Sequence, residues 1–308
     1  MTKALVTGGV GFIGSHITDL LVEKDYEVIV VDNLSTGSIK NLNAEAVFYE
    51  ADICEPGLRD IFKKEKPGFI LHQAAQVSVR NSVSDPKFDA SVNILGSINL
   101  LECCREFNVR KVIYASSGGA VYGEPQNLPV DENHPIQPLS PYGASKYSIE
   151  NYLYTYRVNY GLDYTVLRYS NVYGPRQDPF GEAGVVAIFT ERLLEDVDPV
   201  IHGDGNQTRD FVYVRDVADA NLMAMGKKTL RRELNIGTGV ETSVNDIYHK
   251  LKEITNSKAS PVYDDPVPGE VKKIRLDIGL AQRELGWKPK INFDEGLKET
   301  VNWLKKKK

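Results

Sequence analysis

The sequence predicts an α/β protein built on a doubly wound parallel sheet and followed by a smaller C-terminal α/β lobe. Three observations lead to this fold class. Short apolar runs alternate with helical patterns through the first half of the 308-residue chain. The runs are apolar throughout, which is typical of parallel strands covered on both faces. A glycine-rich turn joins the first of these runs to the first helix.

The predicted strands are short and contain few polar residues. They are expected at residues 4–6, 27–31, 46–49, 69–72, 112–115 and 164–167. The helices are recognised by apolar residues repeated every three or four positions, as at Ile13, Ile17, Leu20 and Leu21 in the predicted helix 13–23. Two longer helices are predicted at 92–107 and 142–160. Right-handed crossovers then give the doubly wound sheet.

After about residue 170 the pattern loosens, and glycine and proline become common. Helices are predicted again at 185–194, 214–225 and 244–254. We therefore predict a large domain over residues 1–170, to which the chain returns at about 211–236, and an interleaved smaller lobe over 171–308.

Charge and apolar patterning argue against several classes of function. The formal net charge is −5 and the body of the chain has no basic tract, which does not favour nucleic-acid binding. The lysines at 305–308 are interpreted as a solvated helix end. No apolar stretch approaches the roughly 18 residues of a membrane span, and the N-terminus does not resemble a signal peptide. A cytoplasmic location is therefore expected.

The cysteines and histidines show no pattern of a metal site. Cys54, Cys103 and Cys104 have neither metal-ligand spacing nor the arrangement of a disulfide framework. Cys103 and Cys104 lie in an apolar helical stretch, so we expect them to pack as small core residues. We predict no bound metal.

The glycine-rich turn contains Gly8, Gly9, Gly11 and Gly14, between the first strand and the first helix. Glycine lets the backbone approach a pyrophosphate closely, and the helix N-terminus faces that anion with free N–H groups. Asp32 closes the second strand 18 residues after Gly14, where a carboxylate hydrogen-bonds the adenosine ribose and repels a 2′-phosphate. This Rossmann pattern predicts bound NAD, in preference to NADP.

Tyr142 and Lys146 lie four residues apart and therefore share one face of a helix. A nearby ammonium lowers the pKa of a phenol from its usual value near 10, as does the positive nicotinamide of oxidised NAD. Tyr142 is therefore the candidate general base. Pro141 suits the first turn of the helix and Ser140 its N-cap. Beside the cofactor turn, this pair predicts hydride chemistry at a carbon that carries a hydroxyl.

Several polar residues end predicted strands, where ligands bind in sheets of this kind. Ser117 is the candidate that hydrogen-bonds the substrate oxygen, and the alternative is a turn serine that bonds its own backbone. Asp52 is either an adenine contact or a strand-end cap. His72 is interpreted as a structural residue.

These residues, in their order along the chain, resemble the UDP-glucose 4-epimerase family of extended short-chain dehydrogenases/reductases. The resemblance covers nearly the whole length. It rests on segments at 7–16, 31–35, 72–75, 93–96, 115–123, 141–146, 167–176 and 203–211.

The resemblance implies an enzyme that interconverts UDP-galactose and UDP-glucose by transient oxidation at carbon 4 with tightly bound NAD. The catalytic residues it implies are Ser117, Tyr142 and Lys146. The cofactor contacts it implies are Gly8, Gly11, Phe12, Ile13, Gly14, Asp32, Asn33, Ser35, Gly37, Asp52, Ile53, Ala74, Ala75, Gln76, Asn93, Tyr142, Lys146 and Tyr169. The contacts to the UDP-hexose substrate it implies are Ser117, Tyr142, Asn171, Val185 through its backbone, His202, Arg209 and Lys272.

The chain departs from the family pattern in three places. The segment 266–270 has Val267 where the family often has an arginine, and the cations that remain nearby are Lys272, Lys273 and Arg275. The hydroxyl before the Tyr-Gly pair at 122–123 lies one residue farther away than in the commonest pattern, so Ser117 is chosen over Ser116 by alignment. Ile274 stands at the position that, in the family, sets the size of the pocket for the substituent at carbon 2 of the sugar. A residue of this size leaves open whether that substituent is a hydroxyl or an N-acetyl group.

Alternative functions use the same residues differently. Dehydratases typically carry an Asp-Glu pair where this chain has residues 117–119, which argues against dehydration. A UDP-N-acetylhexosamine or UDP-glucuronate 4-epimerase is an alternative, and Arg176 is a cation for the uronate carboxylate. Arg209 either holds the UDP or pairs with Asp210 or Asp216. A non-enzymatic NAD-binding redox sensor would tolerate loss of Tyr142 or Lys146, although this chain has both.

The family also implies a homodimer formed through two long helices of each subunit. The predicted helices 92–107 and 142–160 are the candidates. Tyr152, Tyr154 and Tyr156 either supply apolar area to that interface or pack inside the monomer.

Overall fold

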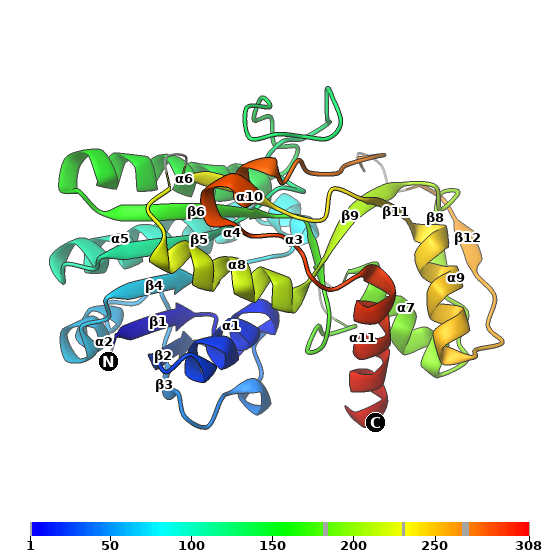
Figure 1. Ribbon diagram of the computed structural model, residues 1–308, viewed down its shortest axis with the longest axis horizontal. Coiled ribbons are helices and arrows are strands. Elements are labelled where there is room, and N and C mark those ends of the chain that lie inside the picture. The colour runs from blue at the N-terminus through cyan, green and yellow to red at the C-terminus, as the bar shows by residue number, and fades with distance from the viewer. Residues whose placement is uncertain (1, 181–183, 230–231, 267–270, 308) are drawn as a thin grey trace.

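The computed structural model describes residues 2–180, 184–229, 232–266 and 271–307. A seven-stranded parallel sheet forms the centre of the larger part of the molecule. The strand order is β10-β6-β5-β4-β1-β2-β3. The strands are β1 (Lys3–Thr7), β2 (Glu27–Asp32), β3 (Val47–Glu50), β4 (Phe69–His72), β5 (Lys111–Ser117), β6 (Asp163–Tyr169) and β10 (Glu233–Ile236). Figure 1 shows helices on both faces of this sheet, so the predicted doubly wound α/β fold is confirmed.

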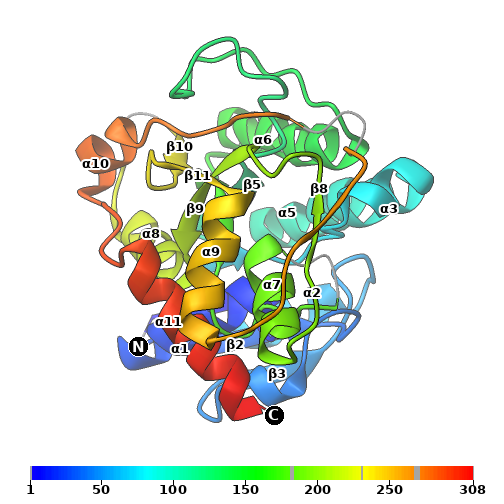
Figure 2. The ribbon, with the colours of Figure 1, turned by 90° about the vertical axis from the view of Figure 1, so that its right-hand side faces the viewer.

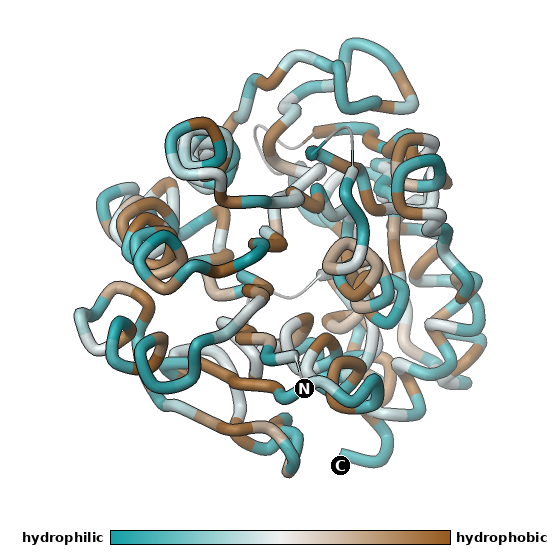
Figure 3. Tube along the Cα trace, turned by 60° about the vertical axis from the view of Figure 1, so that its left-hand side comes forward, coloured by the Kyte–Doolittle hydropathy of each residue, from teal (hydrophilic) through white to brown (hydrophobic). Residues whose placement is uncertain are grey.

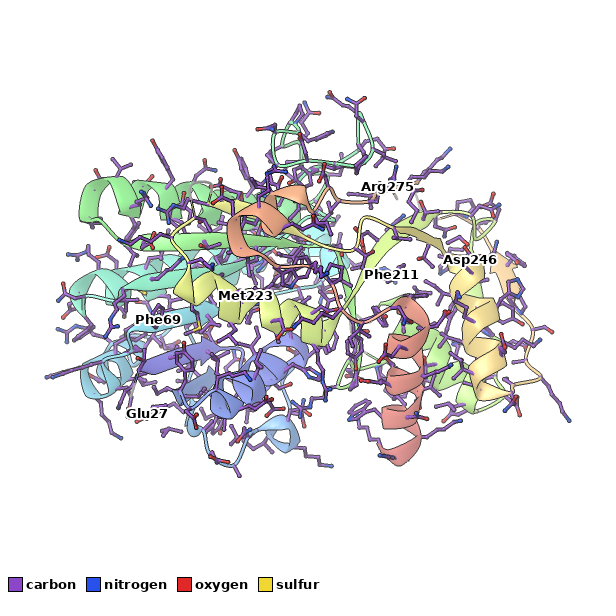
Figure 4. All side chains as sticks on the ribbon, in the orientation of Figure 1. Glu27, Phe69, Phe211, Met223, Asp246 and Arg275 are labelled. Atoms are coloured by element: carbon purple, nitrogen blue, oxygen red, sulfur yellow. The ribbon has the colours of Figure 1, made fainter. Side chains whose placement is uncertain are left out.

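Alternate residues of each strand enter two different cores, because successive side chains point to opposite faces. Val6, Val30 and Leu71 belong to one core, together with Met223, which Figure 4 labels on α8 (Val214–Gly226). Their neighbours along the strands enter the other core, with side chains from the helices on that face. Burial on both faces explains why the strands are apolar throughout.

Two sets of helices supply the other side of each core. One face is covered by α1 (Phe12–Glu23), α8 and α10 (Gly279–Leu285). The other is covered by α2 (Leu58–Glu65), α5 (Ser97–Glu106) and α6 (Pro141–Tyr160), with the short α3 (Val79–Ser84) and α4 (Pro86–Ala90) beside α6. In Figure 3 the helices change between hydrophobic and hydrophilic colour around each turn, as amphipathic helices do.

The predicted long helix 92–107 is present, but its first part is a π-helix. A π-helical segment spans Ser91–Gly96, and α5 begins only at Ser97. The Ser97 hydroxyl donates to the Asn93 carbonyl at 2.6 Å, within the turn where the two helices meet. Gly96 is required there, because a Cβ atom would lie 2.9 Å from the Cys54 Sγ atom. Cys103 and Cys104 are buried in the core as expected, and Cys54 is exposed.

A smaller group of elements lies beyond the carboxyl ends of the strands (Figure 1). A three-stranded sheet joins β7 (Asn171–Tyr173), β9 (Thr208–Tyr213) and β11 (Glu241–Ser243). A second pair joins β8 (Val200–His202) to β12 (Val262–Asp264). The helices α7 (Val185–Leu194), α9 (Val244–Thr255) and α11 (Phe293–Lys307) stand side by side in Figure 2. They share a core that includes Phe211 of β9, labelled in Figure 4.

The chain returns to the large sheet later than the sequence predicts. Residues 208–213 form β9 in the three-stranded sheet. The following α8 and β10 rejoin the large part, where β10 pairs with β6, and α10 packs there as well. The helix α11 extends to Lys307, so Lys305–Lys307 form a solvated helix end, and Lys308 lies outside the described residues. Within the described ranges, no helix is both long and apolar enough to cross a membrane.

Candidate active site

The glycine-rich turn folds tightly between β1 and α1. Gly8 has a φ of +66°, and the Gly11 N–H donates to the Gly8 carbonyl at 3.1 Å. A Cβ atom on Gly14 would lie 2.1 Å from the Gly8 oxygen, and one on Gly8 would lie 2.8 Å from the nitrogen of Ala74. Side chains at these positions would therefore collide with the backbone. The first turn of α1, with Phe12 and Ile13, presents its N–H groups directly after this turn.

Asp32 lies beside the turn at the end of β2. Its carboxylate accepts the backbone N–H groups of Val10 at 3.2 Å and Leu34 at 2.9 Å. Burial raises the pKa of Asp32, and these two hydrogen bonds oppose that shift. A Cβ atom on Gly37 would lie 2.9 Å from the same carboxylate, so the loop after β2 approaches Asp32 closely.

Asn33 and Asp52 join the ends of two neighbouring strands. Asn33 Nδ2 donates to Asp52 at 2.7 Å, and Asn33 Oδ1 accepts the Ser35 N–H at 3.1 Å. The other Asp52 oxygen accepts the Cys54 N–H at 2.8 Å. Asp52 therefore caps the segment after β3, as one of the two interpretations requires, and the buried Ile53 follows it. Together, the tight turn, the free N–H groups and the carboxylate fit a dinucleotide cofactor.

Thr7, at the end of β1, holds the predicted cofactor residues after β4, and its hydroxyl also contacts His72. The Thr7 hydroxyl accepts the N–H groups of residues 73 and 74, each at 3.2 Å, so its own hydrogen goes to His72 Nδ1 at 2.7 Å. His72 Nε2 then donates to Ser97 Oγ at 2.9 Å. Burial lowers the pKa of His72 to about 3, so the ring is neutral. His72 thus links β1, β4 and α5, which is a structural role.

Further cofactor candidates lie around the same edge of the sheet. Tyr169 ends β6, and its hydroxyl accepts from Asn221 Nδ2 at 2.7 Å. Ala75 and Gln76 follow β4, and the Gln76 N–H donates to Asn93 Oδ1 at 2.8 Å. The structure therefore brings the candidates from β1 to β6 to one edge.

Tyr142 and Lys146 project from the first turns of α6. Ser140 caps this helix by accepting the Gly143 N–H at 3.2 Å, and Pro141 is its first residue, as predicted. Lys146 Nζ donates to the Ala115 carbonyl at 3.0 Å and lies 5.9 Å from the centroid of the Tyr142 ring. Lys146 is therefore anchored to β5 and held close to the ring of Tyr142.

Burial acts on both members of the Tyr142–Lys146 pair. Burial raises the pKa of Tyr142 to about 12, against a hydrogen bond with Ser117 that lowers it. Burial also lowers the pKa of Lys146 to about 8. The sequence-based expectation, that Lys146 and the positive nicotinamide of oxidised NAD together lower the pKa of Tyr142, stays a prediction, and burial of the phenol opposes both.

Ser116 and Ser117 face in different directions at the end of β5. The Ser116 hydroxyl donates to the buried Glu150 at 2.6 Å. Ser117 instead hydrogen-bonds Tyr142. A Cβ atom on Gly119 would lie 4.0 Å from Ser117 Oγ and 3.8 Å from Asn171 Oδ1, so these two polar side chains border the same glycine. The geometry therefore supports the choice of Ser117 made by alignment.

The candidate substrate residues lie on the elements beyond the sheet. Asn171 is in β7 and Arg209 in β9, which pair with each other. Lys272 is exposed, and its carbonyl accepts the N–H of residue 208 at 3.0 Å, so it lies beside Arg209. Val185 begins α7. His202 ends β8, with Nδ1 3.9 Å from Asp264, and the side chain of Gln207 donates to its carbonyl at 2.9 Å.

Asp210 and Asp216, the alternative partners of Arg209 in the sequence analysis, accept hydrogen bonds from backbone N–H groups. Asp210 accepts the N–H groups of Thr238 at 2.8 Å and Leu276 at 3.2 Å. Asp216 accepts the N–H groups of residues 290 and 291 at 3.0 and 3.1 Å. Both carboxylates therefore join segments that are distant in sequence. Arg209 Nη1 donates to the carbonyl of residue 208 at 2.9 Å.

The positions near Val267 and Ile274, where the chain departs from the family pattern, differ in how the structure treats them. Val267 and residues 268–270 lie outside the described residues. Arg275, labelled in Figure 4, has its Nε atom 3.3 Å from Glu241, whereas Lys272 and Lys273 are exposed. Ile274 is 3% exposed and packs in a core cluster with Val121, Tyr122, Val130 and Leu276.

Two charged residues behind the site were missed by sequence reasoning. Glu150 lies one turn after Lys146 on α6, and Arg168 precedes Tyr169 on β6. Arg168 donates to both oxygens of Glu150, at 3.1 and 2.5 Å, and to the Tyr122 hydroxyl at 3.0 Å. The available signal was an arginine within an otherwise apolar strand, which requires a buried partner.

Comparison with known proteins gives a consistent result. A model of the "NAD dependent epimerase/dehydratase family" matches residues 4–237. A protein of Methanocaldococcus jannaschii named putative UDP-glucose 4-epimerase is 55% identical over 301 residues, 98% of each chain. The crystal structure of UDP-glucose 4-epimerase with UDP-glucose from Thermotoga maritima is 52% identical, with a TM-score of 0.97 over 99% of each chain. The Thermus thermophilus UDP-glucose 4-epimerase complex with NAD is 42% identical, with a TM-score of 0.94 over 99% of each chain.

Proposed function

The chain belongs to the NAD dependent epimerase/dehydratase family, and we propose that it is a UDP-glucose 4-epimerase that interconverts UDP-galactose and UDP-glucose. One observation carries the proposal. Ser117, Tyr142 and Lys146 meet at the edge of the sheet where the glycine turn and Asp32 also lie. Its likeness to relatives that carry this name supports the choice of substrate.

NAD is the cofactor of this enzyme and, when bound, would supply hydride transfer at carbon 4 of the sugar. The backbone around Gly8, Gly11 and Gly14 would face its pyrophosphate, because side chains there would collide with the backbone. Asp32 would accept the ribose hydroxyls. The segments after β3 to β6, with Asp52, Ala74, Asn93 and Tyr169 among them, would line the remainder.

The chain's own residues move the proton. Tyr142 takes the proton of the carbon-4 hydroxyl and later gives it back, and Ser117 hydrogen-bonds the same oxygen. Burial raises the pKa of Tyr142, so its ionisation depends on the positive charges placed beside it, and Lys146 is one of them. Lys146 is held in place by the Ala115 carbonyl, which fixes the distance between the two side chains.

The smaller lobe, predicted over residues 171–308, would hold the UDP group. Arg209 lies at the start of β9, and Lys272 lies on the segment whose carbonyl accepts the N–H of residue 208, so both would offer positive charge to the diphosphate. Asn171 lies near Ser117 across Gly119, so it would contact the sugar or its phosphate. The N-terminus of α7 at Val185 and the imidazole of His202 complete the proposed contacts.

The uronate alternative is not favoured, because its candidate cation is already engaged. Arg176 Nη2 lies 2.7 Å from Asp19 of α1. The preceding Pro175 carbonyl is 2.9 Å from His16 Nε2, also on α1. Arg176 therefore ties its loop to α1, and the proposal keeps a neutral hexose as the substrate.

We further propose a homodimer formed through α5, α6 and the short helices beside them. Tyr156 is 7% exposed and donates to Glu102 at 2.6 Å, so it packs inside the subunit. Tyr152, Tyr154 and Leu95 are exposed and leave apolar area for a second copy. Light scattering tests this state, and a monomeric mass would contradict it. The cytoplasmic location stays a prediction from the sequence.

The direct test is conversion of UDP-galactose by the purified protein. We expect UDP-glucose to form without added reductant, as read from the carbon-4 stereochemistry by NMR. A panel of UDP-sugars with N-acetyl and carboxylate groups defines the preferred sugar. The proposal is wrong if protein that retains NAD interconverts no UDP-hexose.

A further inference from the structure

A buried carboxylate, Asp89, lies close to the proposed catalytic pair and has no role in the chemistry described so far. It belongs to α4, which packs against α6 and the π-helical segment Ser91–Gly96. Its side chain is almost wholly enclosed, at 1% exposure. A carboxylate removed from water to this degree needs donors and compensating charge.

The carboxylate of Asp89 fixes an amide network that reaches Tyr142. Asp89 Oδ1 accepts from Gln76 Nε2 at 2.8 Å and from Asn93 Nδ2 at 3.1 Å. Because a carboxylate only accepts, both amides must turn their NH₂ groups toward it. The same Asn93 NH₂ group lies 3.1 Å from Ser145 Oγ, which donates to the Tyr142 carbonyl at 2.9 Å.

The Asn93 amide also orients the segment after β4. Its Oδ1 accepts the Gln76 N–H at 2.8 Å, and its Nδ2 donates to the Gln76 carbonyl at 3.0 Å. A flipped Asn93 amide would place donor against donor at the Gln76 N–H, and acceptor against acceptor at Asp89 and at the Gln76 carbonyl. The carboxylate therefore sets one orientation for a side chain that joins the proposed cofactor edge to the first turns of α6.

The charge of Asp89 acts on the groups that face it. These are Tyr142 and Lys146 from α6, Tyr114 from β5 and, through Lys146, His72 from β4. The charged residues at 80 on α3 and at 85 and 87 on α4 are exposed to solvent. Glu150 of α6 also acts on Tyr114, but it is paired with Arg168.

Lys146 depends on this charge because its other surroundings do not favour the ammonium form. Among the described residues, no carboxylate lies within 4.0 Å of its Nζ atom, which donates to a backbone carbonyl. Burial lowers the pKa of Lys146, and the negative charge of Asp89 raises it. The same charge raises the pKa of Tyr142.

We propose that Asp89 is a positioning residue for the Tyr142–Lys146 pair, because its carboxylate holds Asn93, which reaches Tyr142 through Ser145, and places a negative charge beside that pair. The effect of Asp89 on turnover rests on the proposed function, whereas its effect on Lys146 does not. No atom of Asp89 needs to touch the sugar for this role.

Asp89→Asn tests the charge while keeping the shape and the Oδ1 acceptor for both amides. The protonation of Lys146 is followed by NMR of protein labelled with ¹⁵N at the lysine side chains, and Lys146→Arg assigns its signal. Starting from a pKa of about 8, the midpoint is expected to fall by about one pH unit in the variant. In the epimerase assay, both limbs of the pH profile move to lower pH, because both groups lose the same negative neighbour.

Asp85→Asn is the matched control. Asp85 lies four residues earlier, is exposed, and caps α4 by accepting the Phe88 N–H at 3.0 Å, which asparagine also does. It loses the same charge on the same helix, but solvent screens that charge. The Lys146 midpoint and both limbs of the pH profile should stay where they are in the wild type.

An unchanged Lys146 midpoint in folded Asp89→Asn overturns the proposal. So does a fall in turnover without movement of either limb, which is what a purely structural residue would give. If the variant does not fold, the side-chain ¹³C carboxyl signal of Asp89 in the wild type decides, since a protonated Asp89 at pH 7 excludes the role. The NMR titration needs no epimerase activity, so failure of the proposed function remains distinguishable.

Discussion

Arg168 and Glu150 form an ion pair in which each side chain is only 4% exposed, and this pair joins the central sheet to the helix that carries Tyr142 and Lys146. Two parallel hydrogen bonds make the contact bidentate. Removal of one partner leaves the other charge buried, which costs far more than the pair itself contributes.

Glu150→Ala is therefore expected to lower the free energy of unfolding by about 3–5 kcal/mol, because Arg168 keeps its charge without a partner. Denaturant titration measures the loss. The control is Lys250→Ala, which breaks the exposed pair between Lys250 and Asp294 and should cost less than about 1 kcal/mol. Similar losses in the two variants would contradict this account of the buried pair.

Ser117→Ala and Ser116→Ala should differ although the residues are neighbours. Loss of the Ser117 hydroxyl should reduce turnover by about 10²-fold, because the donor to the reacting oxygen is gone. Loss of the Ser116 hydroxyl removes a donor to Glu150 and should cost about 1 kcal/mol of stability with turnover nearly unchanged. Epimerase rates and unfolding curves of both variants check this, and the opposite pattern would assign the role to Ser116.

Tyr142→Phe should retain NAD and reduce turnover by about 10²–10⁴-fold, because only the proton-transferring oxygen is removed. Retained NAD is read from the absorbance of the desalted protein, and turnover from UDP-galactose conversion. Tyr154→Phe is the control, since Tyr154 lies on the same helix and is 62% exposed. Full turnover in Tyr142→Phe would mean that another group is the base.

Gly14→Ala should abolish NAD retention, because the added Cβ atom would lie 2.1 Å from the Gly8 oxygen and must open the turn. Gly226→Ala is the control, since a Cβ atom at that position meets nothing within 4 Å. The NAD content of the two purified proteins decides the matter. Wild-type content in Gly14→Ala would show that the turn relaxes without losing its function.

Acid should destabilise the protein partly through His16. Burial lowers the pKa of His16 from 6.5 to about 4, so below pH 6.5 the unfolded chain takes up a proton that the folded chain does not. This stability is present above pH 6.5 and is lost as the pH falls toward 4. Between pH 7 and 5 the loss from this one histidine is about 2 kcal/mol.

His16→Gln should therefore lose about 2 kcal/mol less than the wild type over that interval, as measured by urea titration at the two pH values. His249→Gln replaces an exposed histidine and should behave like the wild type. An unchanged pH dependence in His16→Gln would show that the ring takes up its proton at the same pH in the folded and unfolded states.

The large sheet was predictable because its strands are buried on both faces and therefore apolar throughout. The segment 69–72 is correct to the residue. The short β8, β11 and β12 contain three residues each, too few for a periodic signal. The π-helical segment before α5 has no local sequence pattern, and its Gly96 packs closely against Cys54, which is far away in sequence.

The site was predictable where a local pattern carries the chemistry. Asp32, Tyr142 and Lys146 follow from spacing alone. The direction of the Tyr142 pKa does not, because it depends on burial by residues from other elements. Asp89 and Glu150 looked like ordinary helix charges, since nothing in their neighbourhood along the chain shows that tertiary packing encloses them.

The late arrival of β10 has a consequence for protein engineering. A fragment ending at residue 170 would lack both β10 and α8, which cover the outer edge of β6 and the apolar side of α1. The exposed strand would then offer unpaired backbone groups to other chains, a known route to aggregation. The nucleotide-binding portion is therefore not a transplantable module, because α10, later still in the chain, also packs in the same core.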